Sequence, residues 1–287
     1  MRALCVGLAL AVVGVTGANA QSSCGAYDFA GPYSEAFLAG EPFAGAGQAA
    51  ETILTMADGA CHQDKVIAAL QPTLGPVVGY KAAATSEGAQ KQLGLDGPVL
   101  GVLLAEMLRQ DGTTVEIDEG ARLIFELDLL ARVGDASINE AQTREEALAS
   151  LDAFIPFVEL GDLMVPKGAA ITGPLLQAMN AGARLGVVGT PVTTEGMTAA
   201  SIGEASGTLT RDLTVVAEAP VTALLGHPLD AVLWVRDAAN ARGMALKPGD
   251  VLSLGSLGRF ELAAPGAIAA TYRGLGPSEE MVTLTLK

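Results

Sequence analysis

Two carboxylates interrupt an apolar run at Leu123–Val133, which reads L-I-F-E-L-D-L-L-A-R-V. Side chains alternate between the two faces of a β-strand, so a strand here would turn Phe125 and Leu127 toward a core. Glu126 and Asp128 would then share the opposite face. Two like charges in an apolar strand are costly without a compensating cation, whereas a solvent-facing strand tolerates them. The run therefore predicts a strand that carries either a divalent metal site or a solvated acidic face.

Other apolar runs and helical spacings predict a mixed α+β fold with a β-rich C-terminal half. The further predicted strands are Val77–Lys81, Phe157–Leu160, Leu185–Val188, Leu213–Ala217, Val251–Leu254, Arg259–Ala263, Ile268–Tyr272 and Met281–Leu286. The predicted helices are Gly47–Leu70 with an interruption near Asp58, Ser86–Leu93, Arg144–Phe154, Thr172–Met179 and Leu229–Arg242. The run Val99–Met107 fits either a strand or a helix.

Composition supports a well-buried globular protein. Hydrophobic residues make up 50% of the 287 positions and charged residues 17%, which argues against disorder. The formal net charge of −15 excludes nucleic acid as an expected partner, because phosphate binding needs a basic surface. The acidity itself fits either solubility or attraction of metal cations.

The N-terminus has the pattern of an export signal over residues 1–20. Arg2 supplies a short basic region, Ala3–Val15 an apolar region, and residues 18–20 read Ala-Asn-Ala, so Gln21 would begin the mature chain. A membrane anchor is the alternative, but the apolar run is shorter than the roughly 20 residues that a span needs. The sequence predicts a periplasmic or secreted protein without stable membrane insertion after cleavage.

Removal of that segment leaves Cys24 and Cys61 as the cysteines of the mature chain. An even pair in an exported protein predicts a disulfide. It would tie the N-terminal arm to the first long helix. Two separate thiols are the alternative, since a sequence gives no Cα separation.

Several ordered blocks carry a resemblance to a known family. They read G-Y-K-A-A-A-T-S, Q-L-G-L-D-G-P-V-L-G-V-L-L, N-A-G-A-R-L-G-V-V-G, G-H-P-L-D-A-V-L-W-V and A-R-G-M-A-L-K-P-G-D-V-L-S-L-G-S-L. Over Gly75–Gly276 the chain resembles the hydratase/decarboxylase branch of the fumarylacetoacetate hydrolase superfamily. The resemblance implies a mixed β-roll or barrel with flanking helices over residues 75–287. Residues 21–74 would form an N-terminal arm and helices.

The resemblance also implies a metal site. An acidic pair on a strand and a third acid downstream hold a divalent metal in this family, and they fall on Glu126, Asp128 and Glu159. Asp128 stands where the family has a Glu, one methylene longer. The implied ion is Mg²⁺ or Mn²⁺. A competing register would put Gly120 and Arg122 on the pair and abolish the site; it leaves the two acids of the apolar strand unexplained.

The implied catalytic residues are Lys81 and Asp96. Lys81 ends a β-rich run, where it could reach a substrate carboxylate or enolate, or simply cap a strand. Asp96 could relay a proton, or bond its own turn. The chain departs from the branch at Gly182 and Leu254, where hydroxyl-bearing residues are usual.

The two histidines are weaker candidates. His227 stands where a helix is predicted to begin, which favours capping and packing over acid/base chemistry. His62 belongs to no motif and is expected on the surface. No serine nucleophile motif, zinc spacing or dinucleotide fingerprint occurs in the sequence.

The implied function is a metal-dependent hydratase, a hydro-lyase acting on a 2-oxo or 2-hydroxydienoic acid such as 2-oxopent-4-enoate. A small 2-oxo acid would be its substrate, and a homo-oligomer its assembly. A decarboxylase or acylpyruvate hydrolase of the same fold is one alternative. A non-catalytic, exported small-molecule-binding protein is another, because the branch is typically cytoplasmic and this chain has a predicted signal.

Overall fold

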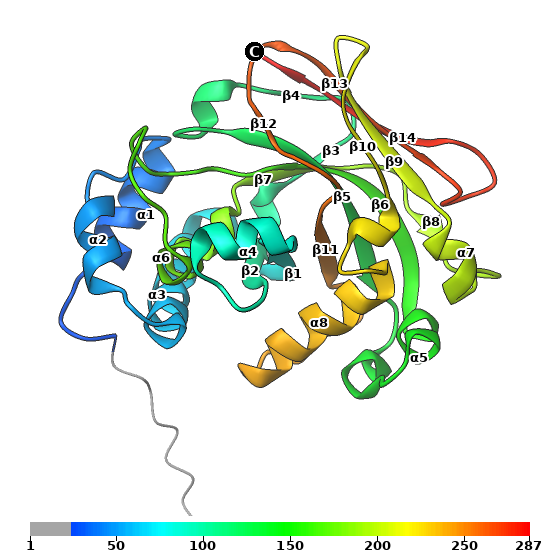
Figure 1. Cartoon of the computed structure of the whole chain (residues 1–287), viewed down its shortest axis with the longest axis horizontal. Coiled ribbons are helices and arrows are strands. Elements are labelled where there is room, and N and C mark those ends of the chain that lie inside the picture. Colours follow the sequence, from blue (N-terminus) through cyan, green and yellow to red (C-terminus); the bar gives the residue numbers. More distant parts are fainter. Residues whose placement is uncertain (1–23) are drawn as a thin grey trace, which may run out of the picture.

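The computed structural model describes residues 24–287, so the predicted signal segment lies outside the described residues. At its centre two long antiparallel strands, β5 (Ile124–Val133) and β6 (Leu151–Leu160), pair with Glu126 opposite Glu159. They belong to a nine-stranded sheet that curls into a half-barrel (Figure 1). Its path runs β2 (Val99–Leu104), β1 (Val77–Ala83), β11 (Val251–Ser256), β5, β6, β7 (Leu185–Val188), β3 (Leu108–Gln110). Two short strands extend it: β12 (Glu261–Leu262) on β5 and β8 (Val192–Thr193) on β6.

A second sheet packs on β6 and carries much of the β-rich C-terminal half. Its five strands run in the order β10 (Thr214–Pro220), β9 (Ser206–Arg211), β13 (Gly266–Arg273), β14 (Glu280–Leu286), β4 (Thr113–Val115). Both β13 and β14 contact β6. The α+β class and the curled, roll-like sheet predicted from the sequence are confirmed.

Helices cover the outside of the curled sheet. They are α1 (Ala30–Ala39), α2 (Ala46–Thr52), α3 (Met56–Leu74), α4 (Glu87–Leu93), α5 (Arg144–Ala149), α6 (Gly173–Ala178), α7 (Ala199–Gly203) and α8 (Pro228–Ala241). Short 3₁₀ turns span Ala105–Met107, Ile117–Glu119, Ala136–Glu140, Asn180–Gly182 and Val221–Ala223. Helix α8 packs on β11 and β1, while α3 packs on α1 and α6 (Figure 1). Within residues 24–287, no helix is both long and apolar enough to cross a membrane.

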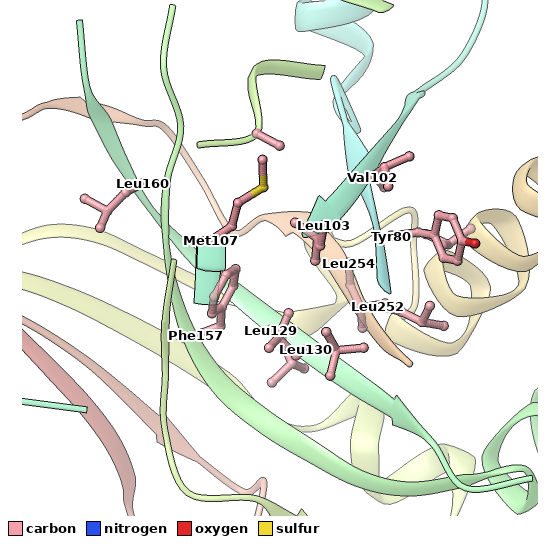
Figure 2. Close-up of a cluster of buried hydrophobic side chains, with 14 of the residues drawn as sticks. Tyr80, Val102, Leu103, Met107, Leu129, Leu130, Phe157, Leu160, Leu252 and Leu254 are labelled. Atoms are coloured by element: carbon pink, nitrogen blue, oxygen red, sulfur yellow. The ribbon is translucent and has the colours of Figure 1, made fainter. Parts of the chain in front are cut away.

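The core lies where β5, β6 and β11 come together. Leu129 of β5 and Leu252 of β11 lie on one face of the sheet and are completely buried, whereas Phe157 of β6, the strand partner of Asp128, is buried on the other face (Figure 2). The odd-numbered positions of β5 thus face apolar neighbours, as the alternation predicted, but most of the even-numbered face is buried as well. Burial of each such side chain stabilises the fold by about 1.5–3 kcal/mol.

The disulfide prediction is confirmed. Cys24 is bonded to Cys61, and their Cα atoms are 5.5 Å apart. Because Cys61 lies in α3, the bond ties the N-terminal arm to the first long helix.

One predicted helix is wrong in its second half. Thr143 caps α5 through the backbone N–H of Glu146, as its spacing suggests, but the helix ends at Ala149. Residues 151–160 then form β6, because their nearly continuous apolar side chains are buried between β5, the second sheet and β7. Pro156 is tolerated inside this strand, at the point where the neighbour on one side changes from β8 to β7.

Two further expectations need correction. The break in the N-terminal helical region lies before Thr55, which forms a capping box with Asp58, so Asp58 begins a helix and does not interrupt one. His62 is not on the surface. Its side chain is buried in α3 with its ring edge-on to Tyr27 and Phe29.

Strand β9 was not predicted. Its polar sequence S-G-T-L-T-R does not favour a strand by itself, and pairing with its neighbours β10 and β13 stabilises it.

Candidate active site

A cavity of about 770 Å³ opens beside the first residues of β5. Arg122, Ile124 and Glu126 all line it. They are spaced by two residues, so they form one row of side chains on one face of the chain. The row places a cation, an apolar side chain and a carboxylate in order along one wall. Cavities of this size are typical of small-molecule sites.

Three charged side chains meet at one end of this cavity. Glu126 and Glu159 are direct partners across β5 and β6, and both line the cavity. Lys81 of β1 is buried, and its Nζ donates hydrogen bonds to the Glu159 carboxylate and to the Ala181 carbonyl, the latter at 3.3 Å. The structure thus brings together three of the five residues predicted for the site.

Backbone geometry fixes the position of Lys81. Its strand partner is Gly101, and a Cβ at Gly101 would lie only 2.5 Å from Lys81 Cγ. Only glycine leaves room there for the aliphatic stem of the lysine. The Ala181 carbonyl, which accepts the other hydrogen bond of Lys81, belongs to a turn in which Asn180 and Ala181 both have a φ of 55°. The Asn180 amide stabilises that turn by bonding the N–H and carbonyl of Val102.

Burial and neighbouring charges shift the pKa values in this cluster. Burial, followed by the like charge of Glu159, raises the pKa of Glu126 to about 7, although Lys81 and the Ser256 hydroxyl oppose the shift. Burial alone would lower the pKa of Lys81, but Glu159 and Glu126 outweigh it and hold that pKa above its ordinary value. Lys81 is therefore a permanent cation near neutral pH, whereas Glu126 exchanges a proton there.

Asp128 has a different environment from Glu126. It is completely buried and does not line the cavity. One carboxylate oxygen accepts the backbone N–H groups of Leu129 at 2.6 Å and Gly255 at 3.1 Å, and the other accepts the Ser253 hydroxyl. Burial, followed by the charge of Glu159, raises the pKa of Asp128 well above its ordinary value.

An irregularity in β11 makes the Gly255 contact possible. The pairing of β11 with β5 shifts register between Ser253 and Ser256. Gly255 lies in this bulge with a φ of 109°, a conformation that favours glycine. Its N–H is thereby directed at Asp128. The strand thus holds Asp128 within the protein while Glu126, two residues earlier, faces the cavity.

No group of three or more His, Cys, Asp or Glu side chains within residues 24–287 is arranged to hold a metal ion. The acids predicted for a metal are split: Glu126 and Glu159 face the cavity, and Asp128 binds protein donors. Direct metal binding by Asp128 would require it to give up those hydrogen bonds. The three-acid site stays a prediction.

Asp96 and His227 lie away from this cluster. Asp96 is exposed in the turn between α4 and β2 and does not line the cavity. His227 caps α8 by accepting the Leu229 N–H at 3.1 Å on Nδ1, and its Nε2 lies 2.9 Å from the Ala199 carbonyl oxygen. The capping interpretation of His227 is confirmed.

Sequence reasoning missed the cavity-lining Arg122, Arg259 and Ser256. The sequence did contain a signal for Arg122, since it lies four residues before Glu126 and an extended chain puts both side chains on the same face. Ser256 ends β11 and Arg259 lies in the segment after it, and only the tertiary structure places these residues beside the start of β5.

Comparisons with known proteins agree with this fold. No family profile matches the chain. A "2-keto-4-pentenoate hydratase" of Burkholderia vietnamiensis strain G4 is 31% identical over 210 residues, which cover 70% of this chain and 76% of that protein. The chain therefore belongs to the hydratase/decarboxylase branch of the fumarylacetoacetate hydrolase superfamily, an enzyme family that includes the 2-keto-4-pentenoate hydratases.

Solved structures show the same fold at lower identity. The 4-oxalocrotonate decarboxylase of Pseudomonas putida G7, complexed with magnesium and adipate, superimposes with a TM-score of 0.78 at 20% identity. The match covers 89% of this chain and 94% of that one. A fumarylpyruvate hydrolase of Pseudomonas aeruginosa, in complex with Mn²⁺ and pyruvate, has a TM-score of 0.53 at 14% identity over 72% of this chain and 89% of that one.

Proposed function

We propose that this protein is a divalent-metal-dependent hydratase of a short 2-hydroxydienoic acid, the enol form of an acid such as 2-oxopent-4-enoate. One observation carries the proposal: Lys81, Glu126 and Glu159 form a buried charged cluster at the wall of a cavity large enough for such an acid. The relative of 31% identity is named for hydration of 2-keto-4-pentenoate, which supports the same reaction class.

The donor set fits a metal ion bound mainly by Glu126 and Glu159. These carboxylates face each other across two strands, and Lys81 supplies one positive charge for them and the adjacent Asp128. Mg²⁺ is commonly held by one or two carboxylates with water and substrate oxygens completing the shell. The solved relatives with Mg²⁺ and Mn²⁺ support a divalent ion here. When bound, it would polarise the 2-oxo and carboxylate oxygens of the substrate.

The remaining roles belong to side chains of this chain. Lys81, held by Glu159 and the Ala181 carbonyl, keeps a positive charge where negative charge develops on the substrate enolate. In the reaction, the 2-hydroxyl proton of the dienol is lost and C5 gains a proton. Water then adds its oxygen to C4 and a proton to C3, which gives a 4-hydroxy-2-oxo acid. Asp96 as a proton relay remains a prediction from resemblance, and its exposed position outside the cavity lends it no support.

The test is turnover by purified protein. With Mg²⁺ or Mn²⁺, we expect loss of the dienol absorbance of 2-hydroxypenta-2,4-dienoate and formation of 4-hydroxy-2-oxopentanoate, identified by NMR. EDTA should abolish the reaction, and calorimetry should show binding of the ion. Release of CO₂ would favour a decarboxylase, and two acid products an acylpyruvate hydrolase. Ligand binding without any turnover over a panel of such acids would favour a binding protein.

Export and self-association are separate proposals from the sequence. The Cys24–Cys61 disulfide supports an oxidising compartment, because structural disulfides are rare in reducing ones. Fractionation of cells that express the full chain should recover it outside the cytoplasm with Gln21 at its N-terminus. Light scattering of that material should show a homo-oligomer.

A further inference from the structure

Arg122 is a cation in the cavity wall that the proposed chemistry does not use. Its half-buried side chain lines the cavity, and Nη1 donates a hydrogen bond to the Val165 carbonyl at 3.1 Å. Within residues 24–287 it forms no ion pair. A guanidinium carries five N–H donors, so most of its capacity is available to a ligand.

The acid that accepts the backbone N–H of Arg122 does not use that capacity. Asp162 also lines the cavity, but its carboxylate accepts backbone N–H groups. One oxygen accepts those of Arg122 at 2.8 Å and Met164 at 3.1 Å, and the other accepts that of Ala121 at 2.8 Å. These bonds hold the chain segment that carries Arg122 and leave its guanidinium directed to the carbonyl of Val165 and the cavity.

The two ends of the row are well separated. Arg122 lies two residues before β5, and Glu126 lies four positions after Arg122, or about 13 Å along an extended chain. Ile124 lies between them and presents an apolar surface to the cavity. The wall is therefore suited to a ligand with a polar group at each end and a hydrocarbon middle.

The cavity has a second cation and an aromatic ring in the segment after β11. Arg259 and Phe260 line it and are both exposed. Arg259 forms an ion pair with Glu261, Nε to Oε1 at 3.0 Å. Because Arg259 already has an acidic partner, Arg122 is the stronger anion-binding group of the two.

We propose that Arg122 forms an anion subsite for the far end of the substrate, so that the protein prefers 2-oxo dicarboxylic acids to monocarboxylic acids of equal length. The first carboxylate and the 2-oxo group would lie at Lys81, and the second carboxylate at Arg122. The inference rests on the proposed function for the identity of the 2-oxo end. The preferred substrate class would then be 2-oxo dicarboxylic acids, which carry a second carboxylate that a five-carbon monocarboxylic acid such as 2-oxopent-4-enoate does not have.

The experiment compares two ligands that differ in one terminal group. 2-Oxoadipate and 2-oxohexanoate have the same chain length, and only the first has a second carboxylate. With Mg²⁺ present, calorimetry should show at least about tenfold tighter binding of 2-oxoadipate, the effect expected of a charge-assisted hydrogen bond. In Arg122→Gln this preference should fall to less than about twofold while the affinity for 2-oxohexanoate stays within about twofold of wild type.

Two further variants separate charge from geometry and from nonspecific effects. Arg122→Lys keeps the charge but loses the planar fork, so it should retain only part of the preference. Arg132→Gln is the matched control, because it removes the same charge from β5, the strand that follows Arg122, and Arg132 pairs with Asp152 at 2.7 Å outside the cavity. It should leave the preference unchanged.

The outcomes separate this inference from the proposed function. Equal affinities in the wild type, an unchanged preference in Arg122→Gln, or no binding of either acid would overturn the subsite. A preference lost in Arg122→Gln but without hydration of any dienoic acid would retain the subsite and reject the hydratase. Hydration of 2-hydroxypenta-2,4-dienoate without any discrimination between the two 2-oxo acids would reject the subsite alone.

Discussion

Glu126 and Asp128 lie two residues apart on the same strand and on the same face, yet they have different surroundings. Glu126 opens onto the cavity beside Lys81 and Glu159. Asp128 is covered by the bulge of β11 and satisfied by Ser253, Gly255 and its own neighbour. One carboxylate is available for chemistry, and the other serves as a structural acceptor that joins two strands. The difference shows that a two-residue spacing puts two side chains on one face of a strand but does not determine which other segments cover each of them.

Lys81 should be the most sensitive position for activity. Replacement by Met in Lys81→Met removes the cation that offsets Glu159 and any enolate charge, so kcat should fall by about 10²–10⁴-fold. The exposed Lys167 near the cavity provides a matched Lys167→Met control that should retain turnover. Steady-state kinetics on the dienoic acid makes the measurement. Similar losses in both variants would contradict the assigned role.

The buried acid should matter most for folding. Asp128→Ala leaves the buried Gly255 N–H and Ser253 hydroxyl without their acceptor, and we expect a loss of about 2–4 kcal/mol in the free energy of unfolding. Glu126→Ala should cost less than about 1 kcal/mol or stabilise the fold, because it removes a desolvated charge that faces Glu159. Urea unfolding of the metal-free proteins measures both values. A larger loss in Glu126→Ala would invert the comparison.

Metal affinity should show the opposite order. Glu126→Gln should weaken Mn²⁺ binding by at least about tenfold, whereas Asp128→Asn should change it by less than about threefold. Asparagine retains an acceptor and the volume of Asp128, so it keeps the fold while removing a charge. Titration calorimetry with Mn²⁺ alone distinguishes the two. Equal losses would establish Asp128 as a direct ligand, as the sequence resemblance implies.

A smaller effect concerns pH. The pKa of Glu126 is raised from 4.5 to about 7 in the fold, so between these values the folded state binds more protons than the unfolded state. The metal-free wild type should therefore lose stability as pH rises through this window, by about 1–3 kcal/mol relative to Glu126→Gln. Unfolding curves at pH 4.5 and 8 measure the difference. A parallel pH dependence in the two proteins would assign the effect to other groups.

The central strand and several turns could be predicted because their signals are local. Alternation at Phe125, Leu127 and Leu129 defines one face of β5, and Thr143, which directly precedes the helical residues, caps α5. The boundary at Ala149 and the whole of β9 could not, since neighbouring strands stabilise segments whose own sequences favour other structures.

The candidate site divides in the same way. Resemblance indicated Lys81, Glu126 and Glu159, and the structure brings them together. It also indicated Asp128 and Asp96, because a sequence pattern contains residue type and spacing but does not show which side chains are covered by other parts of the fold. Arg122 shows the converse case. Its even spacing from Glu126 was visible in the sequence, but only the folded cavity shows that its side chain has no acidic partner there.

The sequence by itself determined the mixed α+β class, the pairing of Cys24 with Cys61 as a candidate disulfide, and the acidic strand with its lysine and downstream glutamate. These follow from residue chemistry and short-range periodicity. Only the tertiary structure decided which carboxylate faces the cavity and which is buried. That choice depends on the bulge at Gly255, contributed by a strand more than a hundred positions further along the chain.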